Sequence, residues 1–67
     1  MIQVTVNGKA HSFGHRLNVG ELLVQLQMAG RKVAVERNGE IVPRGLHGNT
    51  LVENGDQLEI VVAVGGG

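Results

Sequence analysis

The sequence contains no cysteine. Disulfide bonds, thiolate metal sites and a cysteine nucleophile are therefore excluded. Aromatic residues are almost as scarce, because Phe13 is the only residue among phenylalanine, tyrosine and tryptophan. Charge of one sign is not in excess either, since six Lys and Arg balance six Asp and Glu. A protein that binds nucleic acid through a basic patch and stacked bases is not indicated.

Long apolar runs are also missing. No stretch approaches the roughly 20 apolar residues that a membrane-spanning helix needs, so no membrane partner is expected. The first residues, Met1–Val4, lack the charged and then apolar pattern of a secretory signal, which predicts a cytoplasmic location. With 67 residues, of which 42% are hydrophobic, the chain is expected to form a single small domain with a thin core.

Two β-hairpins are predicted from runs that alternate apolar and polar residues around an Asn-Gly pair. Alternation over four to eight residues is the pattern of a half-buried strand. Asparagine and glycine tolerate the positive φ angles of a type I′ turn, which joins two antiparallel strands. The expected hairpins are 2–6 with 9–13 around Asn7-Gly8, and 33–37 with 40–42 around Asn38-Gly39.

One helix is predicted between the hairpins, over residues 18–29. Asn18 and Glu21 have the spacing of a capping box, in which each side chain bonds the other residue's backbone N–H. Apolar residues follow at helical spacing, and Gly30 suits the position just after the helix. The apolar residues of this face are Val19, Leu22, Leu23 and Leu26.

The order of elements predicts an α+β fold. Pro43 ends the second hairpin, residues 44–50 are expected to form a loop with one helical turn, and a last strand is expected at 57–64. A single helix can cover only one face of the sheet, and the last strand is expected to return parallel to the first. This order is typical of the ubiquitin-like β-grasp fold, a mixed sheet of four to five strands with one main helix on one face. The predicted domain is 1–64, followed by a flexible glycine tail at 65–67.

No active site is predicted. Ser12 lies in the middle of a predicted strand, without the sharp turn that exposes a nucleophile. The histidines His11, His15 and His47 lack metal-ligand spacing and are interpreted as surface imidazoles. The carboxylates are interpreted as solvated strand and turn residues: Glu36, Glu40, Glu53, Asp56 and Glu59. The protein is therefore expected to be neither an enzyme nor a metal protein.

Glycine is in excess, and three of the eleven glycines are the residues Gly65, Gly66 and Gly67. Terminal glycines also occur as frayed ends or linkers. A tail without side chains can instead enter a narrow channel and place its backbone in another protein's active site. The carboxylate of Gly67 would then be the reactive group. A carboxylate is a poor electrophile, and adenylation by ATP would activate it.

Three segments of the chain are the most informative about its family. They are Val33-Ala34-Val35-Glu36, Asn38-Gly39-Glu40-Ile41-Val42-Pro43-Arg44, and Gly55-Asp56-x-Leu58-Glu59-Ile60-Val61 with Ala63-Val64-Gly65-Gly66-Gly67. With these segments the whole chain resembles the thiamine-biosynthesis sulfur carrier proteins, a family with the β-grasp fold. The loop at 45–50 departs from the pattern of that family, in which a more acidic or Trp-containing stretch is frequent.

The resemblance implies a carrier that is modified by partner enzymes. An E1-like adenylyltransferase would use ATP-Mg to adenylate the carboxylate of Gly67, while Gly65–Gly67 occupy its active site. A sulfur donor, such as a desulfurase persulfide, would convert the adenylate to a thiocarboxylate, and thiazole synthase would accept the sulfur. No cofactor is expected to be bound by the carrier itself. The absence of cysteine agrees with this scheme, because the acyl group has to carry the sulfur.

A docking surface is predicted from the alternation of the last strand. If Leu58 and Ile60 face the helix, Val61 and Ala63 lie on the open face of the sheet. Together with Ala34 and Leu46 they would form an apolar patch near the tail for the activating enzyme. Isolated exposed apolar residues are common, however, and remain the alternative interpretation.

Two other functions remain open. The first is a sulfur carrier of another pathway, such as the small subunit of molybdopterin synthase, although the segment 33–44 favours the thiamine family. The second is a ubiquitin-like protein modifier or a plain interaction module, in which Gly67 of a modifier would form isopeptide bonds with lysines.

Overall fold

The computed structural model describes residues 1–62, so the predictions for Ala63, Val64 and the glycine tail lie outside the described residues. Its α-helix and its 3₁₀ helix, η1, lie among seven strands. In chain order the elements are β1 (Ile2–Val6), β2 (Lys9–Phe13), β3 (Leu17–Asn18), α1 (Val19–Gln25), β4 (Val33–Arg37), β5 (Glu40–Val42), η1 (Arg44–Asn49), β6 (Leu51–Val52) and β7 (Gln57–Val62).

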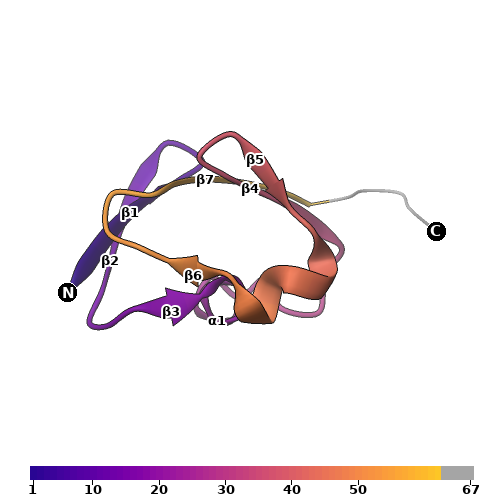
Figure 1. Cartoon of the computed structure of the whole chain (residues 1–67), viewed down its shortest axis with the longest axis horizontal. Helices are drawn as coiled ribbons and strands as arrows, with labels where there is room; N and C mark the ends of the chain where they lie inside the picture. The colour runs from indigo at the N-terminus through magenta and orange to yellow at the C-terminus, as the bar shows by residue number, and fades with distance from the viewer. Residues whose placement is uncertain (63–67) are drawn as a thin grey trace.

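Five strands form the main sheet, in the order β2-β1-β7-β4-β5. β7 runs parallel to β1 and antiparallel to β4, and both hairpins are antiparallel. Figure 1 shows the sheet as an arch, with α1, η1 and the short strands β3 and β6 on its concave side. The predicted β-grasp fold is confirmed, including the parallel return of the last strand beside the first.

The two Asn-Gly turns adopt the predicted conformation. The φ angles are 51° and 82° at Asn7 and Gly8, and 52° and 86° at Asn38 and Gly39. Positive φ at both central residues is the requirement of a type I′ turn, whose twist matches that of the strands it joins. The backbone preference of these two dipeptides therefore sets the register of both hairpins.

The core lies between the main sheet and the layer that contains α1, η1, β3 and β6 (Figure 1). Along β7, Leu58 and Ile60 are buried while Glu59 and Val61 are exposed, as the alternation predicted. Burial of this apolar area is the main stabilising contribution in a chain of this size. The buried apolar residues are Val4, Val6, Leu17, Val19, Leu22, Leu23, Val35, Val42, Val52, Leu58 and Ile60.

The helix begins as predicted and ends earlier. Oδ1 of Asn18 accepts a hydrogen bond from the N–H of Glu21 at 2.7 Å, and Oε1 of Glu21 accepts one from the N–H of Asn18 at 2.9 Å. The predicted end at residue 29 is wrong, because α1 stops at Gln25. Among the described residues, no helix is long and apolar enough to cross a membrane.

A Schellman motif ends the helix, with a glutamine at the position that glycine usually takes. Gln27 has a φ of 60°. The N–H of Met28 donates to the carbonyl of Leu23 at 2.8 Å, and the N–H of Gln27 donates to that of Val24 at 3.0 Å. The left-handed turn lets Met28 pack against the core. Packing of Met28 offers a physical reason why the helix does not continue to Gly30.

The pairing of β3 with β6 was not predicted. Each strand has two residues, too few for a visible alternation, and Leu17 pairs with Val52. Gly20, near the start of α1, has a steric role in the same region. A Cβ at Gly20 would lie 3.2 Å from the capping oxygen of Asn18 and 3.9 Å from the carbonyl oxygen of His47. Glycine therefore leaves room for the cap, whereas the approach of a Cβ to η1 would be an ordinary van der Waals contact.

Candidate functional site

The candidate site is the end of the sheet where β7 approaches the predicted tail. Val62, the last described residue, pairs with Val33 of β4, and Val61 pairs with Ala34. The reactive group predicted at Gly67, the tail residues Gly65 and Gly66, and the docking residue Ala63 lie outside the described residues. The site is therefore described by the surfaces on the two sides of β4 and β7.

The first surface is the open face, the face of the main sheet that is turned away from α1. Val61 is 60% exposed here, and the exposed Ala34 lies directly opposite on β4. Ile41 of β5 is 65% exposed and lies diagonal to Ala34, because its partner in the register is Glu36. Ile41 was missed by the sequence reasoning, although the register across the two-residue Asn38-Gly39 turn, which sets Ile41 opposite Glu36, was a signal that Ile41 faces outward.

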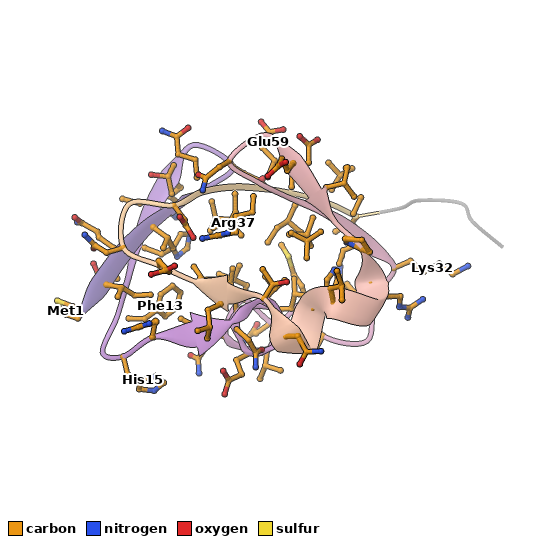
Figure 2. The ribbon with its side chains drawn as sticks, viewed as in Figure 1. Met1, Phe13, His15, Lys32, Arg37 and Glu59 are labelled. Carbon is orange, nitrogen blue, oxygen red and sulfur yellow. The ribbon has the colours of Figure 1, made fainter. Side chains whose placement is uncertain are left out.

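Two carboxylates lie beside these apolar residues on the open face. Glu36 of β4 and Glu59 of β7 are opposite each other in the register. Figure 2 shows Glu59 projecting from the sheet on the side away from α1. Like charges directly opposite on neighbouring strands are destabilising. No ion pair with another described residue compensates for this pair, so the open face combines apolar side chains with negative charge.

Leu46, the fourth predicted docking residue, lies on η1 at the edge of the sheet. Its side chain is 48% exposed, and its N–H donates to the carbonyl of Pro43 at 2.8 Å. It borders a shallow hollow of about 180 Å³ together with Ile41 and Pro43. The structure thus makes Ala34 and Val61 direct neighbours and sets Leu46 beside Ile41 instead.

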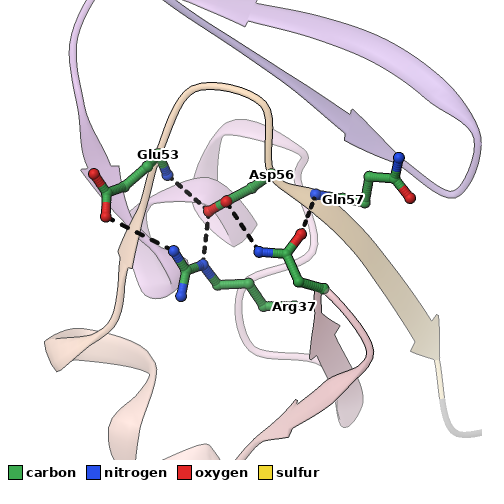
Figure 3. A network of polar contacts seen from close by, with 5 residues as sticks. Arg37, Glu53, Asp56 and Gln57 are labelled. Carbon is green, nitrogen blue, oxygen red and sulfur yellow. Dashed lines mark hydrogen bonds and ion pairs between the residues drawn. The ribbon is translucent and has the colours of Figure 1, made fainter.

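A polar network holds the opposite end of β4, and it corrects the interpretation of Asp56 as a solvated carboxylate. Asp56 is only 7% exposed. Oδ2 of Asp56 accepts a hydrogen bond from Nε of Arg37 at 2.6 Å and one from the N–H of Glu53 at 2.8 Å. Oδ1 accepts one from Nδ2 of Asn38 at 3.1 Å, and Oδ1 of Asn38 accepts one from the N–H of Gln57 at 2.9 Å (Figure 3).

The network keeps Asp56 ionised. Burial alone raises the pKa of Asp56, but hydrogen bonds from the Glu53 N–H, Arg37 and Asn38, together with the charge of Arg37, lower this pKa below its ordinary value of 3.8. Glu53 adds a longer ion pair, with 3.8 Å between its Oε2 and the Arg37 NH2 nitrogen. The network therefore joins the β4–β5 turn to the start of β7 and holds these two parts of the structure together.

The three histidines lie in different surroundings. The ring of His11 stacks on that of Phe13 with centroids 6.3 Å apart, and Nδ1 of His15 is 3.0 Å from the carbonyl oxygen of Arg16. Nε2 of His47 is 3.2 Å from the carbonyl oxygen of Val42. Within the described part of the chain, no cluster of three or more His, Asp and Glu side chains could hold a metal ion.

Comparison with known proteins identifies the family. The model of the ThiS family matches residues 4–67, which is almost the whole chain. The chain belongs to the ThiS family. A crystal structure of a thiamine biosynthesis protein, ThiS, from Geobacter metallireducens resembles this ThiS-family chain with a TM-score of 0.84 and 40% sequence identity. The match covers 98% of this chain and 100% of that protein. The predicted family resemblance is thereby confirmed.

Two curated relatives are thiazole synthases. The relative from Paramagnetospirillum magneticum is 44% identical over 66 residues, and the one from Magnetococcus marinus is 38% identical over 66 residues. Each match covers 98% of this chain and 20% of the relative. This ThiS-family chain therefore spans about a fifth of the length of these relatives.

Proposed function

We propose that this protein is a sulfur carrier for the formation of the thiazole ring of thiamine. The observation that carries the proposal is the ThiS-family match over residues 4–67, which extends to the terminal glycines. The thiazole synthase relatives support the choice of sulfur acceptor, since each contains a segment similar to this chain. The carrier would act as a cosubstrate of partner enzymes rather than as an enzyme.

The chemistry would take place at the carboxylate of Gly67. In an E1-like adenylyltransferase, a carboxylate oxygen attacks the α-phosphorus of ATP-Mg, a mixed anhydride forms and pyrophosphate leaves. The outer sulfur of a persulfide, held by a desulfurase or another donor, then attacks the acyl carbon and AMP leaves. A partner thiol breaks the resulting S–S bond, which leaves the thiocarboxylate on the carrier and a disulfide on the partners. Thiazole synthase takes the sulfur from the thiocarboxylate.

Several features of the chain support this cycle. The chain has no cysteine, so persulfide chemistry has to be supplied by partners. β7 ends at Val62, three residues before Gly65 in the sequence, and its pairing with β4 extends as far as Val62. Because adenylation consumes ATP, the proposal places the protein in the cytoplasm.

The open face is the proposed contact for the activating enzyme. Val61 and Ala34 form its apolar centre near the described end of β7, and Ile41 extends it. Glu36 and Glu59 would face basic side chains of that enzyme, which would offset their mutual repulsion. The proposal therefore predicts a partner surface that is apolar at its centre and positively charged beside it.

Intact-mass measurement of the protein, co-expressed with its activating enzyme and a sulfur donor, tests the carrier role. The expected result is the mass increase of one oxygen replaced by sulfur, and deletion of Gly66 and Gly67 should abolish it. Val24→Ala is the matched control, because Val24 is exposed on α1. Full sulfur loading of the truncated protein would contradict the proposal. Much heavier adducts on lysines of other proteins would indicate a modifier, and rescue of a molybdenum-enzyme defect would indicate the other pathway.

Charge introduced at Val61 tests the open face. Val61→Asp should lower the rate of adenylation at limiting carrier concentration, because an apolar contact is replaced by a charge that must be desolvated. Ala10→Asp is the control, since Ala10 is exposed and lies on the edge strand β2, which β1 separates from β7. Equal adenylation rates for both variants and the unchanged protein would show that the enzyme does not contact Val61.

A further inference from the structure

A second surface lies on the opposite side of β4, towards the helix layer. It is a groove of about 420 Å³ between the α1–β4 connection and η1. Its apolar lining includes the buried Leu23 and the partly buried Met28 and Val33. Three exposed cationic side chains also line it, and no Asp or Glu does. We call this surface the basic groove, and its cations are Arg31, Lys32 and Arg44.

The charges of the basic groove are not used by the fold. Arg31, Lys32 and Arg44 make no ion pair and no side-chain hydrogen bond with any other residue in the range 1–62. They are half of the six Lys and Arg of a chain whose net charge is zero. The nearest contrast is Arg37 at the other end of β4, which has two carboxylate partners. The groove is therefore a local positive region of a neutral molecule.

The position of the groove links it to the tail. Val33 and Ala34 line the groove and pair with Val62 and Val61 of β7, so the groove is one strand away from the last described residue, and Ala34 borders both the groove and the open face. Figure 2 shows Lys32 projecting from the body at the end of the molecule where β7 ends. An enzyme that binds the tail of this chain has to approach this end of the molecule.

We infer that the basic groove receives an acidic segment of the thiazole synthase, with an apolar side chain against Leu23 and Met28 and carboxylates at the cations. The inference rests on the proposed function. The apolar lining favours a peptide over a free phosphate or nucleotide, whose charge would gain nothing from Leu23 and Met28. A nucleic acid is disfavoured, since no Phe, Tyr or Trp is among the described residues that line the groove and the net charge is zero.

Thiazole synthase is chosen as the partner because the open face and the basic groove carry opposite charges. The acidic, apolar open face is assigned to the activating enzyme, and the basic groove has the opposite charge. Two enzymes that take the same tail in turn can then recognise different surfaces. In two relatives a segment similar to this chain is part of a thiazole synthase. In those proteins such a groove would be covalently linked to the enzyme that we propose as its partner.

Calorimetric titration of the full-length protein into thiazole synthase tests the inference. The variant Arg31→Glu/Arg44→Glu should bind about tenfold or more weakly at low ionic strength, and the difference should shrink as salt is added. The matched control is Lys9→Glu/Arg16→Glu, which makes the same change in net charge at exposed residues outside the groove. Unfolding curves of both variants establish that each is folded, and sulfur loading by the activating enzyme should proceed in both.

Each other outcome overturns the inference. Equal loss of affinity in both double variants would mean that thiazole synthase responds only to the net charge of the carrier. Unchanged affinity of the groove variant would mean that thiazole synthase does not contact the groove. If the groove variant lost only its interaction with the activating enzyme, the groove would be the contact of that enzyme instead. If the unchanged protein is loaded with sulfur and binds thiazole synthase, these results count against the groove alone. If it neither loads nor binds, the proposed function itself fails.

Discussion

The two ends of β4 carry the same type of residue in opposite situations. At the turn end, Arg37 is bonded to Asp56 at 2.6 Å and lies near Glu53, and Asn38 adds bonds to Asp56 and Gln57. At the groove end, Arg31 and Lys32 have no such partner among the described residues. A cation that is paired inside the fold contributes to its stability, whereas an unpaired cation on the surface is available to a partner.

The difference also concerns solvent. Asp56 is 7% exposed, so water and salt screen its interactions with Arg37 and Asn38 less than they screen those of a fully exposed carboxylate. Arg31, Lys32 and Arg44 are exposed, and their charges act on a partner most strongly at low ionic strength. We therefore expect substitutions at the turn end to change stability, and substitutions at the groove end to change binding with little change in stability.

The largest expected effect is that of Asp56→Ala. Removing the carboxylate leaves the Glu53 N–H and the Arg37 guanidinium without their acceptor, which should lower the free energy of unfolding by about 3 kcal/mol. Urea unfolding followed by circular dichroism measures this loss. Glu59→Ala removes an exposed carboxylate of β7, the strand that follows Asp56, and should change stability by no more than about 0.5 kcal/mol. Similar losses for the two variants would remove the distinction between the buried and the exposed carboxylate.

A smaller loss of stability is expected when the protein is acidified. Because the pKa of Asp56 is lower in the folded than in the unfolded protein, its ionisation stabilises the fold fully above 3.8, and this contribution is lost as pH falls from there through the folded value. Asp56→Asn should flatten this part of the acid dependence, measured as the midpoint of thermal unfolding against pH. Glu40→Gln, at an exposed residue of β5, is the control. An unchanged acid dependence in Asp56→Asn would show that another group dominates it.

The smallest effect is expected at the groove end. Arg31→Gln/Lys32→Gln should leave the free energy of unfolding within about 0.5 kcal/mol of the unchanged protein, because neither side chain has a partner within the described residues. Urea unfolding under the conditions used for Asp56→Ala provides the measurement. A loss approaching that of Asp56→Ala would mean that the cations of the groove are structural, and the contrast between the two ends would disappear.

Much of the fold could be predicted because its signals are local. The Asn7-Gly8 and Asn38-Gly39 turns need only the φ preferences of two residues, and the start of α1 needs only Asn18 and Glu21. The end of α1 was not predictable in this way. It depends on the packing of Met28 against the core after the left-handed turn, a contact between elements rather than a propensity.

The candidate site was predictable only where it follows the alternation of a strand. The alternation of β7 predicted Val61 on the open face. In β5 the adjacent Ile41 and Val42 are both apolar, so the face of Ile41 follows only from its pairing with Glu36 across the turn. Leu46 lies on a 3₁₀ helix, and no periodic pattern in the sequence predicts how this helix is oriented relative to the sheet. Its position beside Ile41, rather than beside Ala34 and Val61, could be learned only from the folded chain.

The sequence by itself determined the family, the order of the main elements and the absence of cysteine chemistry, because motifs and composition do not depend on distant contacts. Tertiary structure decided the burial of Asp56 and the grouping of Arg31, Lys32 and Arg44 around one groove. These residues come from segments that only folding brings together. Whether a charge is paired or remains available to a partner depends on its neighbours in space.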